Sequence, residues 1–301
     1  MRDGDACSWR VMSSVASQRL LQIGIVPYLN VQPLIWSLTR PGSGEGDPSP
    51  LPARIIPQPP RRLAENLRAG HFDAAIVPVF EYLLNPVYSI VPGVSIACRG
   101  PVHSVALFSE TPLEKVRTVR LDPASLTSVH LIQVLLAERG IRVRFEPAPP
   151  VGGSDSDGPG RGGPPAPLPL EPGTAQVVIG DPAMARRGMH SHEYDLGALW
   201  LEQTGLPFVF AAWLVPPGSR HLPVAATLQK SARTGRGSLE QVAADTAELF
   251  GFTVDEALRY YRENMVYDLG EEELAGWRHY ATLCVRHGLI DRVPDFRFQE
   301  R

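Results

Sequence analysis

The sequence contains little cysteine, little lysine and little net charge. Its 301 residues include three cysteines, Cys7, Cys98 and Cys284, which are far apart and form no C-x-x-C pair. We therefore expect free thiols in a reducing compartment, without a zinc site or dithiol chemistry. Lys115 and Lys230 are the only lysines, which leaves few candidates for a Schiff base. The formal net charge of −3 creates no global basic field, so nucleic acid is not an expected partner.

Long apolar runs are also missing. The first twenty residues contain five charged side chains and no apolar run of signal-peptide length. No later stretch approaches the roughly 20 apolar residues of a membrane span. These absences predict a cytoplasmic protein that does not interact with a membrane. With 44% hydrophobic residues, the chain is long enough to bury a large core in one or two α/β domains.

Two segments are too rich in glycine and proline for a helix or strand. Residues 41–50 hold three of each, and residues 151–173 hold seven glycines and six prolines. We predict surface loops, the second one disordered, and a flexible tail at residues 1–19. A formal G-x-G-x-x-G at residues 158–163 lies in the second loop. Its neighbouring prolines exclude the strand-to-helix turn that a nucleotide phosphate needs.

Between these loops, short apolar runs alternate with amphipathic stretches. Strands are predicted at residues 23–26, 74–77, 104–109, 117–121 and 176–179, and helices at residues 61–69 and 128–139. This alternation indicates an α/β fold with mostly parallel sheets and helices on both faces. From residue 224 to 288 the pattern is helical, with Ser238 and Thr253 as N-caps three residues before Gln241 and Glu256.

Two polar residues follow or precede strands at positions where ligands bind. Asn30 comes after the first strand, at the carboxyl edge where open parallel sheets bind ligands. It is equally suited to cap a helix that starts near Pro33. Ser104 follows a Gly-Pro turn and enters a strand, so its hydroxyl could bind a ligand oxygen or serve an ordinary turn.

A hydroxyl-rich turn connects the strand at residues 117–121 to the following helix. Ser125, Thr127 and Ser128, with the first free N–H groups of that helix, could form a carboxylate cradle or simply cap the helix. Asp181 follows the strand at 176–179 and could cap the next helix or face a ligand-binding cleft at the end of the sheet. Phe208 belongs to an apolar strand whose aromatic residues could line a pocket for a ring or fill the core.

His190 and His192 are two residues apart, which would place both rings on one side of a strand as two metal ligands. No third ligand follows at metal-site spacing. We therefore predict an exposed loop pair and no metal site.

Several motifs occur in an order that resembles a known family. They are Tyr28-Leu29-Asn30 with Pro33, Gly100-Pro101-Val102-His103-Ser104, Thr127-Ser128, Ile179-Gly180-Asp181 and Thr204-Gly205-Leu206-Pro207-Phe208-Val209-Phe210-Ala211. Together they are similar to the chorismate dehydratases of the futalosine route to menaquinone. The similarity extends from about residue 21 to residue 290, without the two Gly/Pro loops.

The resemblance implies a two-lobed fold like that of type 2 periplasmic binding proteins, with the substrate in the cleft. Crossovers are then expected near residues 100–104 and 208–213. Lobe I would be discontinuous, made of residues 20–103 and 212–301. Lobe II would be residues 104–211, including the insert at 151–173.

The resemblance also implies the reaction, in which chorismate loses water to give 3-[(1-carboxyvinyl)oxy]benzoate without any cofactor. Asn30 and Ser104 correspond to the active-site residues of the family. Substrate-binding candidates are Tyr28, Ser125, Thr127, Ser128, Asp181 and Phe208. Many relatives have an arginine where this chain has Leu126, so a charged contact is absent or comes from elsewhere. The proton acceptor is Asp181, Glu81 or a carboxylate of the substrate itself.

The sequence is compatible with two other functions. One is the related enzyme that acts later in the pathway on cyclic dehypoxanthine futalosine. The other is a non-catalytic intracellular protein that binds an organic anion, because a fold does not determine a function.

Overall fold

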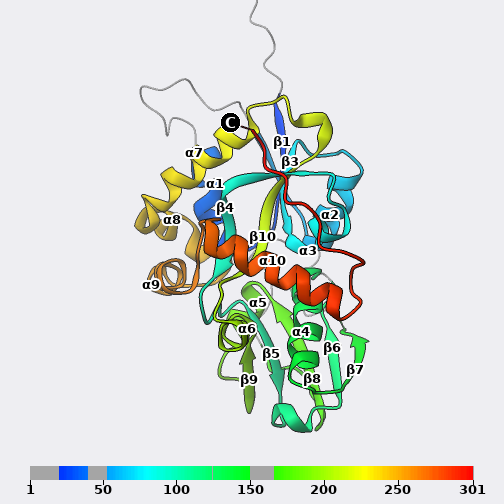
Figure 1. Cartoon of the computed structure of the whole chain (residues 1–301). Helices are drawn as coiled ribbons and strands as arrows, with labels where there is room; N and C mark the ends of the chain where they lie inside the picture. Colours follow the sequence, from blue (N-terminus) through cyan, green and yellow to red (C-terminus); the bar gives the residue numbers. More distant parts are fainter. Residues whose placement is uncertain (1–19, 40–52, 124, 150–165, 301) are drawn as a thin grey trace, which may run out of the picture.

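The computed structural model describes residues 20–39, 53–123, 125–149 and 166–300. These residues form two five-stranded sheets with flanking helices (Figure 1). The predicted tail at 1–19, the loop at 41–50 and the G-x-G-x-x-G at 158–163 lie outside the described residues.

The first sheet has the strand order β2-β1-β3-β10-β4. Its strands are β1 (Leu21–Ile25), β2 (Ala53–Pro57), β3 (Ala74–Pro78), β4 (Ser89–Cys98) and β10 (Phe208–Val215). Strand β1 pairs in parallel with β2 and β3, whereas β10 runs antiparallel to both β3 and β4. The last strand to join this sheet therefore comes from more than a hundred residues beyond β4.

The second sheet has the order β7-β6-β8-β5-β9. Its strands are β5 (Val105–Ser109), β6 (Thr118–Leu121), β7 (Arg144–Pro147), β8 (Thr174–Ile179) and β9 (His192–Asp195). Here β6 pairs in parallel with β7 and β8, while β5 is antiparallel to β8 and β9. Both sheets are thus mixed, but four of the five strands in each run in the same direction, so the prediction of mostly parallel sheets is confirmed. Strands β5 and β10, which each follow a connection from one sheet to the other, are antiparallel to both neighbouring strands.

The helices cover the sheets and fill the C-terminal part of the chain. They are α1 (Gln32–Ile35), α2 (Pro60–Arg68), α3 (Val79–Leu84), α4 (Thr127–Glu138), α5 (Asp181–Met184), α6 (Leu196–Thr204), α7 (Val224–Arg236), α8 (Leu239–Thr246), α9 (Val254–Arg259) and α10 (Glu271–Arg286). A π-helical turn at Tyr260–Asn264 directly follows α9.

One of the two predicted N-caps is confirmed. The Thr253 hydroxyl accepts a hydrogen bond from the Glu256 backbone N–H, and the Glu256 carboxylate accepts one from the Thr253 N–H, which is a capping box. Ser238 precedes α8 but makes no side-chain cap. Its backbone, at φ −133° and ψ 36°, is outside the extended conformation that directs a capping side chain to the helix.

Two short segments connect the sheets. Residues 99–104 lead from β4 to β5, and residues 205–207 lead from α6 to β10. Helix α10 packs against β10 and against α4, so it crosses the middle of the molecule and contacts elements of both halves (Figure 1). The predicted lobe boundary between residues 211 and 212 falls inside β10, and the predicted lobe limits stay a prediction.

The described residues have a continuous apolar core that includes the fully buried Trp200, Trp213 and Trp277. Cys98 and Cys284 are buried free thiols, as predicted, while Cys7 lies outside the described residues. No helix in the described part of the chain is both long and apolar enough to span a membrane.

The end of the 151–173 insert is packed against the second sheet. Leu168 is 9% exposed and joins an apolar cluster with Phe108, and its backbone N–H donates to Nε2 of His190 at 3.1 Å. Nδ1 of His190 lies 2.7 Å from the Glu110 carboxylate. The prediction of disorder is therefore wrong for this end, because an apolar side chain and a buried imidazole fix it.

The prediction of an exposed histidine pair is also wrong for His190, whose side chain is fully buried. His192 lies in β9, where its ring stacks on Tyr194. The two rings therefore have separate partners. Among the described residues, no group of three or more histidine, cysteine or acidic side chains is placed to hold a metal ion.

Candidate active site

A pocket opens between the two sheets. Its free space is about 520 Å³, including the opening to solvent. Six predicted site residues provide polar groups to its lining: Tyr28, Asn30, Ser104, Ser125, Thr127 and Ser128. None of the described residues that line the pocket carries a charge.

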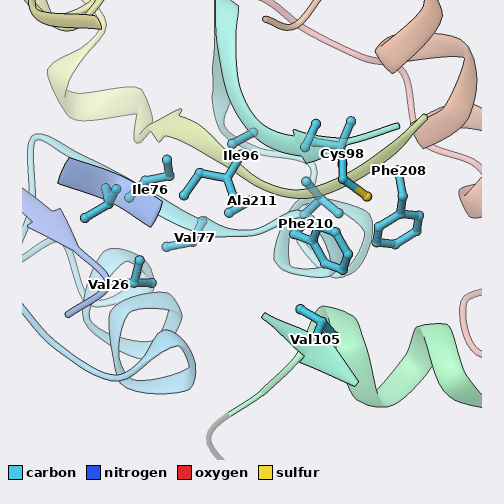
Figure 2. Packing of buried hydrophobic residues seen from close by; sticks show 14 of the residues in the cluster. Val26, Ile76, Val77, Ile96, Cys98, Val105, Phe208, Phe210 and Ala211 are labelled. Atoms are coloured by element: carbon cyan, nitrogen blue, oxygen red, sulfur yellow. The ribbon is translucent and has the colours of Figure 1, made fainter. Parts of the chain in front are cut away.

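The apolar wall of the pocket comes from both sheets. Figure 2 shows Val105, at the start of β5, facing Phe210 and Ala211 of β10, with Val26 and Ile96 further along the same wall. One aromatic ring and several aliphatic side chains thus surround the polar groups. A pocket of this kind suits a ligand with a flat carbon ring and polar substituents.

Asn30 lies in a 3₁₀ turn, Leu29–Val31, just after β1. It does not cap the following helix, because the N-cap of α1 is Val31 and no side chain caps that helix. The Asn30 side chain forms a hydrogen bond with the Tyr260 hydroxyl. Its carbonyl oxygen Oδ1 is buried and has no partner among the described residues. Asn30 therefore presents an unused acceptor at the pocket.

Ser104 is only 2% exposed and ends the turn that leads into β5. Its backbone carbonyl accepts from the Gly180 N–H at 2.7 Å, and its Oγ accepts from the Tyr260 hydroxyl at 2.8 Å. The turn is held by Asp195, whose carboxylate accepts from the N–H groups of Val102 and His103 at 3.0 and 2.7 Å. Such backbone contacts fix the position of the serine before any ligand binds.

The Ser125–Ser128 turn leads into α4 beside the pocket. Thr127 Oγ1 accepts from the Phe80 N–H at 3.2 Å, which ties the turn to the first sheet's side of the molecule. The N-cap of α4 is Leu126, and no side chain caps this helix. Simple capping by the turn hydroxyls is therefore not observed. The N–H groups and the positive dipole of the first turn of α4 are suited to a carboxylate.

Asp181 does not line the pocket but connects its two sides. Its carboxylate oxygens accept from the Leu29 N–H at 3.0 and 3.2 Å, across 152 residues of sequence. Burial raises the pKa of this carboxyl from 3.8 to about 7, partly offset by that hydrogen bond. Because Asp181 is the first residue of α5 and its partner lies on another element, it does not cap its own helix.

Gly180 lets Tyr28 approach the start of α5. Its φ of 70° and ψ of −156° form a conformation available essentially to glycine. A Cβ there would lie 2.6 Å from Cε1 of Tyr28, so the aromatic ring packs directly on the glycine backbone. The Tyr28 ring and the Asp181–Leu29 hydrogen bond therefore hold the same junction.

Two further sequence candidates lie outside the pocket lining. Phe208 packs edge-on against Trp200 and Tyr280 at 5.1 Å, and Phe210 takes the pocket position instead. Glu81, in α3, is fully buried, and its Oε1 accepts from Asn85 and Tyr88. That oxygen also lies 3.3 Å from the exposed Arg68 guanidinium. Burial raises the Glu81 pKa, which the positive charge and the hydrogen bonds oppose.

Tyr260 is the site residue that sequence reasoning missed. It is 2% exposed, and its hydroxyl reaches both Asn30 and Ser104. The sequence around Tyr260 predicts only that it belongs to the helical C-terminal region. No spacing relates it to Ser104, which is 156 residues earlier in the chain.

A family model described as "Menaquinone biosynthesis" matches residues 21–286. The chain belongs to this family. A chorismate dehydratase from Thermus thermophilus is 30% identical over 268 residues, which cover 86% of this chain and 93% of the relative. The family and enzyme class predicted from the ordered motifs are therefore confirmed.

Solved structures confirm the predicted fold. A protein from Archaeoglobus fulgidus is similar with a TM-score of 0.61 and 15% identity, covering 91% of this chain and all of that one. The periplasmic aliphatic sulphonate binding protein SsuA from Escherichia coli has a TM-score of 0.57 and 17% identity, covering 95% of each chain. At such identities the similarity concerns the fold alone. This menaquinone-biosynthesis family member therefore has the fold of the periplasmic binding proteins.

Proposed function

We propose that this enzyme is a chorismate dehydratase, which converts chorismate to 3-[(1-carboxyvinyl)oxy]benzoate and water in the cytoplasm as part of the futalosine route. The observation that carries the proposal is the pocket that combines Asn30 and Ser104 with the hydroxyl-rich turn before α4. The activity of the Thermus thermophilus relative supports it.

The reaction breaks the C3–H and C4–O bonds of chorismate, forms a C3–C4 double bond and makes the ring aromatic. The pocket supplies what such a step requires from a protein, namely orientation and hydrogen bonds to the leaving oxygen. The Ser104 hydroxyl donates to the departing oxygen at C4. The α4 N-terminus, with Ser125, Thr127 and Ser128, binds a substrate carboxylate, and Phe210 packs beside the ring.

A carboxylate of chorismate itself is the preferred proton acceptor. Asp181 and Glu81, the two acids considered from the sequence, are absent from the pocket lining, and the hydrogen bonds of each engage other protein groups. The uncharged lining also leaves the substrate carboxylates without a neutralising side chain among the described residues, which keeps them basic.

The direct test mixes the purified protein with chorismate and follows the product by ultraviolet absorbance and mass spectrometry. Chorismate without protein and the Ser104→Ala variant are the controls. We expect rapid formation of the benzoate product with the wild type, formation about 100-fold slower with Ser104→Ala, and none without protein. Saturable binding of chorismate without product would support the organic-anion binding protein instead. Turnover of cyclic dehypoxanthine futalosine, with none of chorismate, would support the later enzyme of the route.

A further inference from the structure

Three tyrosines of the segment at residues 260–267 form hydrogen bonds with the turn that carries Asn30. The Tyr261 hydroxyl donates to the Leu29 carbonyl at 3.2 Å, and the Tyr267 hydroxyl donates to the Asn30 carbonyl at 3.0 Å. Tyr260 differs from them because it contacts side chains, Ser104 at 2.8 Å and Asn30. It is thus the one described residue whose side chain links both candidate catalytic groups.

The backbone of this segment is unusual at the same place. Helix α9 ends at Arg259 and continues as a π-helical turn over Tyr260–Asn264. A π turn inserts an extra residue into the helical repeat and so rotates the side chains that follow. Such turns are rare and often occur at functional sites. Here the turn directs the consecutive residues Tyr260 and Tyr261 to the Ser104 hydroxyl and to the Leu29 carbonyl, respectively.

We propose that Tyr260 is a positioning residue for dehydration. It holds Asn30 and Ser104 in one hydrogen-bond chain and orients the Ser104 O–H so that it donates a hydrogen bond to the leaving oxygen of the substrate. This inference rests on the proposed function. It adds a third member to the site, contributed by a part of the chain that supplies no pocket-lining residue.

The donor and acceptor inventory supports this role. A tyrosine hydroxyl has one proton, and Tyr260 donates it to Oγ of Ser104. Because Oγ of Ser104 already accepts this hydrogen bond, the Ser104 hydroxyl can donate its own proton to a ligand in the pocket that Ser104 lines. On the other side of Tyr260, Oδ1 of Asn30 is buried without a partner among the described residues. The site therefore presents a donor and an acceptor together, both fixed by the same phenol.

The chain also explains why Ser104 is a good donor to a leaving hydroxide. A hydroxyl that accepts a hydrogen bond becomes a stronger donor, because the bonds polarise one another in a buried site. Burial keeps the phenol itself neutral, since it raises the Tyr260 pKa well above the usual value, and the nearby Asp181 carboxylate raises it further. Tyr260 and Ser104 both keep their protons throughout, so the role is orientation and polarisation.

The test removes only the linking hydroxyl, in Tyr260→Phe, and measures kcat and KM for chorismate. We expect kcat to fall about 10- to 100-fold, less than for a donor that touches the substrate, with KM changed less than threefold. Tyr82→Phe is the matched control. It removes another buried hydroxyl, which bonds the Asp295 carbonyl and the Arg297 N–H away from the pocket, so it should lower the melting temperature but not kcat.

A double variant separates positioning from a general structural effect. Because Tyr260 acts mainly through Ser104, adding Tyr260→Phe to Ser104→Ala should lower kcat further by much less than the roughly 10- to 100-fold loss expected in the wild-type background, since only the contact to Asn30 remains to be lost. A wild-type kcat in Tyr260→Phe, or two losses that multiply in the double variant, would overturn the positioning role while leaving the proposed function intact. An inactive wild type would overturn the proposed function, and the role of Tyr260 with it.

A second replacement covers the case in which Tyr260→Phe does not fold, as judged by thermal unfolding and by calorimetric binding of the product. Incorporation of 3-fluorotyrosine at position 260 keeps the ring and hydroxyl but makes the phenol a stronger donor. We expect an altered kcat at unchanged KM. An unchanged kcat would argue against the hydrogen-bond chain.

Discussion

Replacing Gly180 by alanine should weaken the junction between the two sheets of this enzyme. The backbone at φ 70° and ψ −156° costs an alanine about 1–3 kcal/mol. The new Cβ would also lie 2.6, 2.7 and 2.9 Å from three carbons of the Tyr28 ring, whereas carbon atoms in contact prefer roughly 3.5–4.0 Å. The ring must therefore move by about 1 Å, which adds about 1–3 kcal/mol of overpacking. We expect a total loss of about 4 kcal/mol.

The matched control is Gly205→Ala. Gly205 has a similar φ of 70° with ψ 3°, and nothing lies within 4 Å of its added Cβ. Only the left-handed backbone cost of about 1 kcal/mol applies there. Urea unfolding of both variants should therefore show a difference of about 3 kcal/mol. In a Tyr28→Ala background the Gly180→Ala change should lose its steric part, about 1–3 kcal/mol.

Activity provides the second measurement for this prediction. A shift of the Tyr28 ring by about 1 Å also moves the adjoining Leu29–Asn30 turn, and misplacement of this size costs up to about 100-fold in rate. Chorismate turnover by Gly180→Ala should fall at least tenfold, while Gly205→Ala should remain near wild type. Equal stability and equal rates of the two alanine variants would refute the close contact between Tyr28 and Gly180.

Three further predictions concern single side chains. Asn30→Ala and Ser104→Ala should each lower kcat about 100-fold or more without unfolding the protein, because each removes a polar group fixed at the reacting atoms; near-wild-type rates would remove that residue from the site. Asp181 has a raised pKa of about 7, so the folded state binds more protons than the unfolded state between about pH 4 and 7, and its contribution to stability falls as the pH rises through this window. The upper bound on this loss of unfolding free energy is about 4 kcal/mol, and the partial exposure of Asp181 reduces it to about 2. Urea unfolding at pH 5 and pH 8 should show the loss in the wild type but not in Asp181→Asn. Parallel pH profiles of the two proteins would contradict this prediction. Leu168→Ala should cost about 2 kcal/mol in urea unfolding, against less than about 0.5 for Leu84→Ala at the surface; equal effects would mean that Leu168 does not anchor the insert.

Part of the candidate site was accessible from the sequence because it depends on local patterns. The ends of strands are encoded by short apolar runs followed by turn residues, and this logic located Asn30 and Ser104 at the edges of strands. The same holds for the turn at Ser125–Ser128, between β6 and α4. These residues do line one pocket. The Thr253 capping box was predictable for the same reason, since its partner is three residues away.

Where local signals allowed two outcomes, packing decided between them. The sequence of this apolar strand does not distinguish Phe208 from Phe210. In the folded protein Phe208 packs against Trp200 and Tyr280, and Phe210 lines the pocket. His190 is polar in sequence, but contact with Glu110 and Leu168 buries it. The Ser238 side chain matches the capping pattern, yet the connection from α7 to α8 imposes a backbone that does not direct it to the helix.

The sequence by itself therefore determined the family, the α/β class and the groups at the ends of strands, because each is encoded within a few residues or in an ordered set of motifs. The tertiary structure alone decided how distant segments meet. The hydrogen bonds from Tyr260 to Ser104 and from Leu29 to Asp181 join residues more than 150 positions apart. Such contacts depend on the path of the whole chain through two mixed sheets, and no local preference of either partner encodes them.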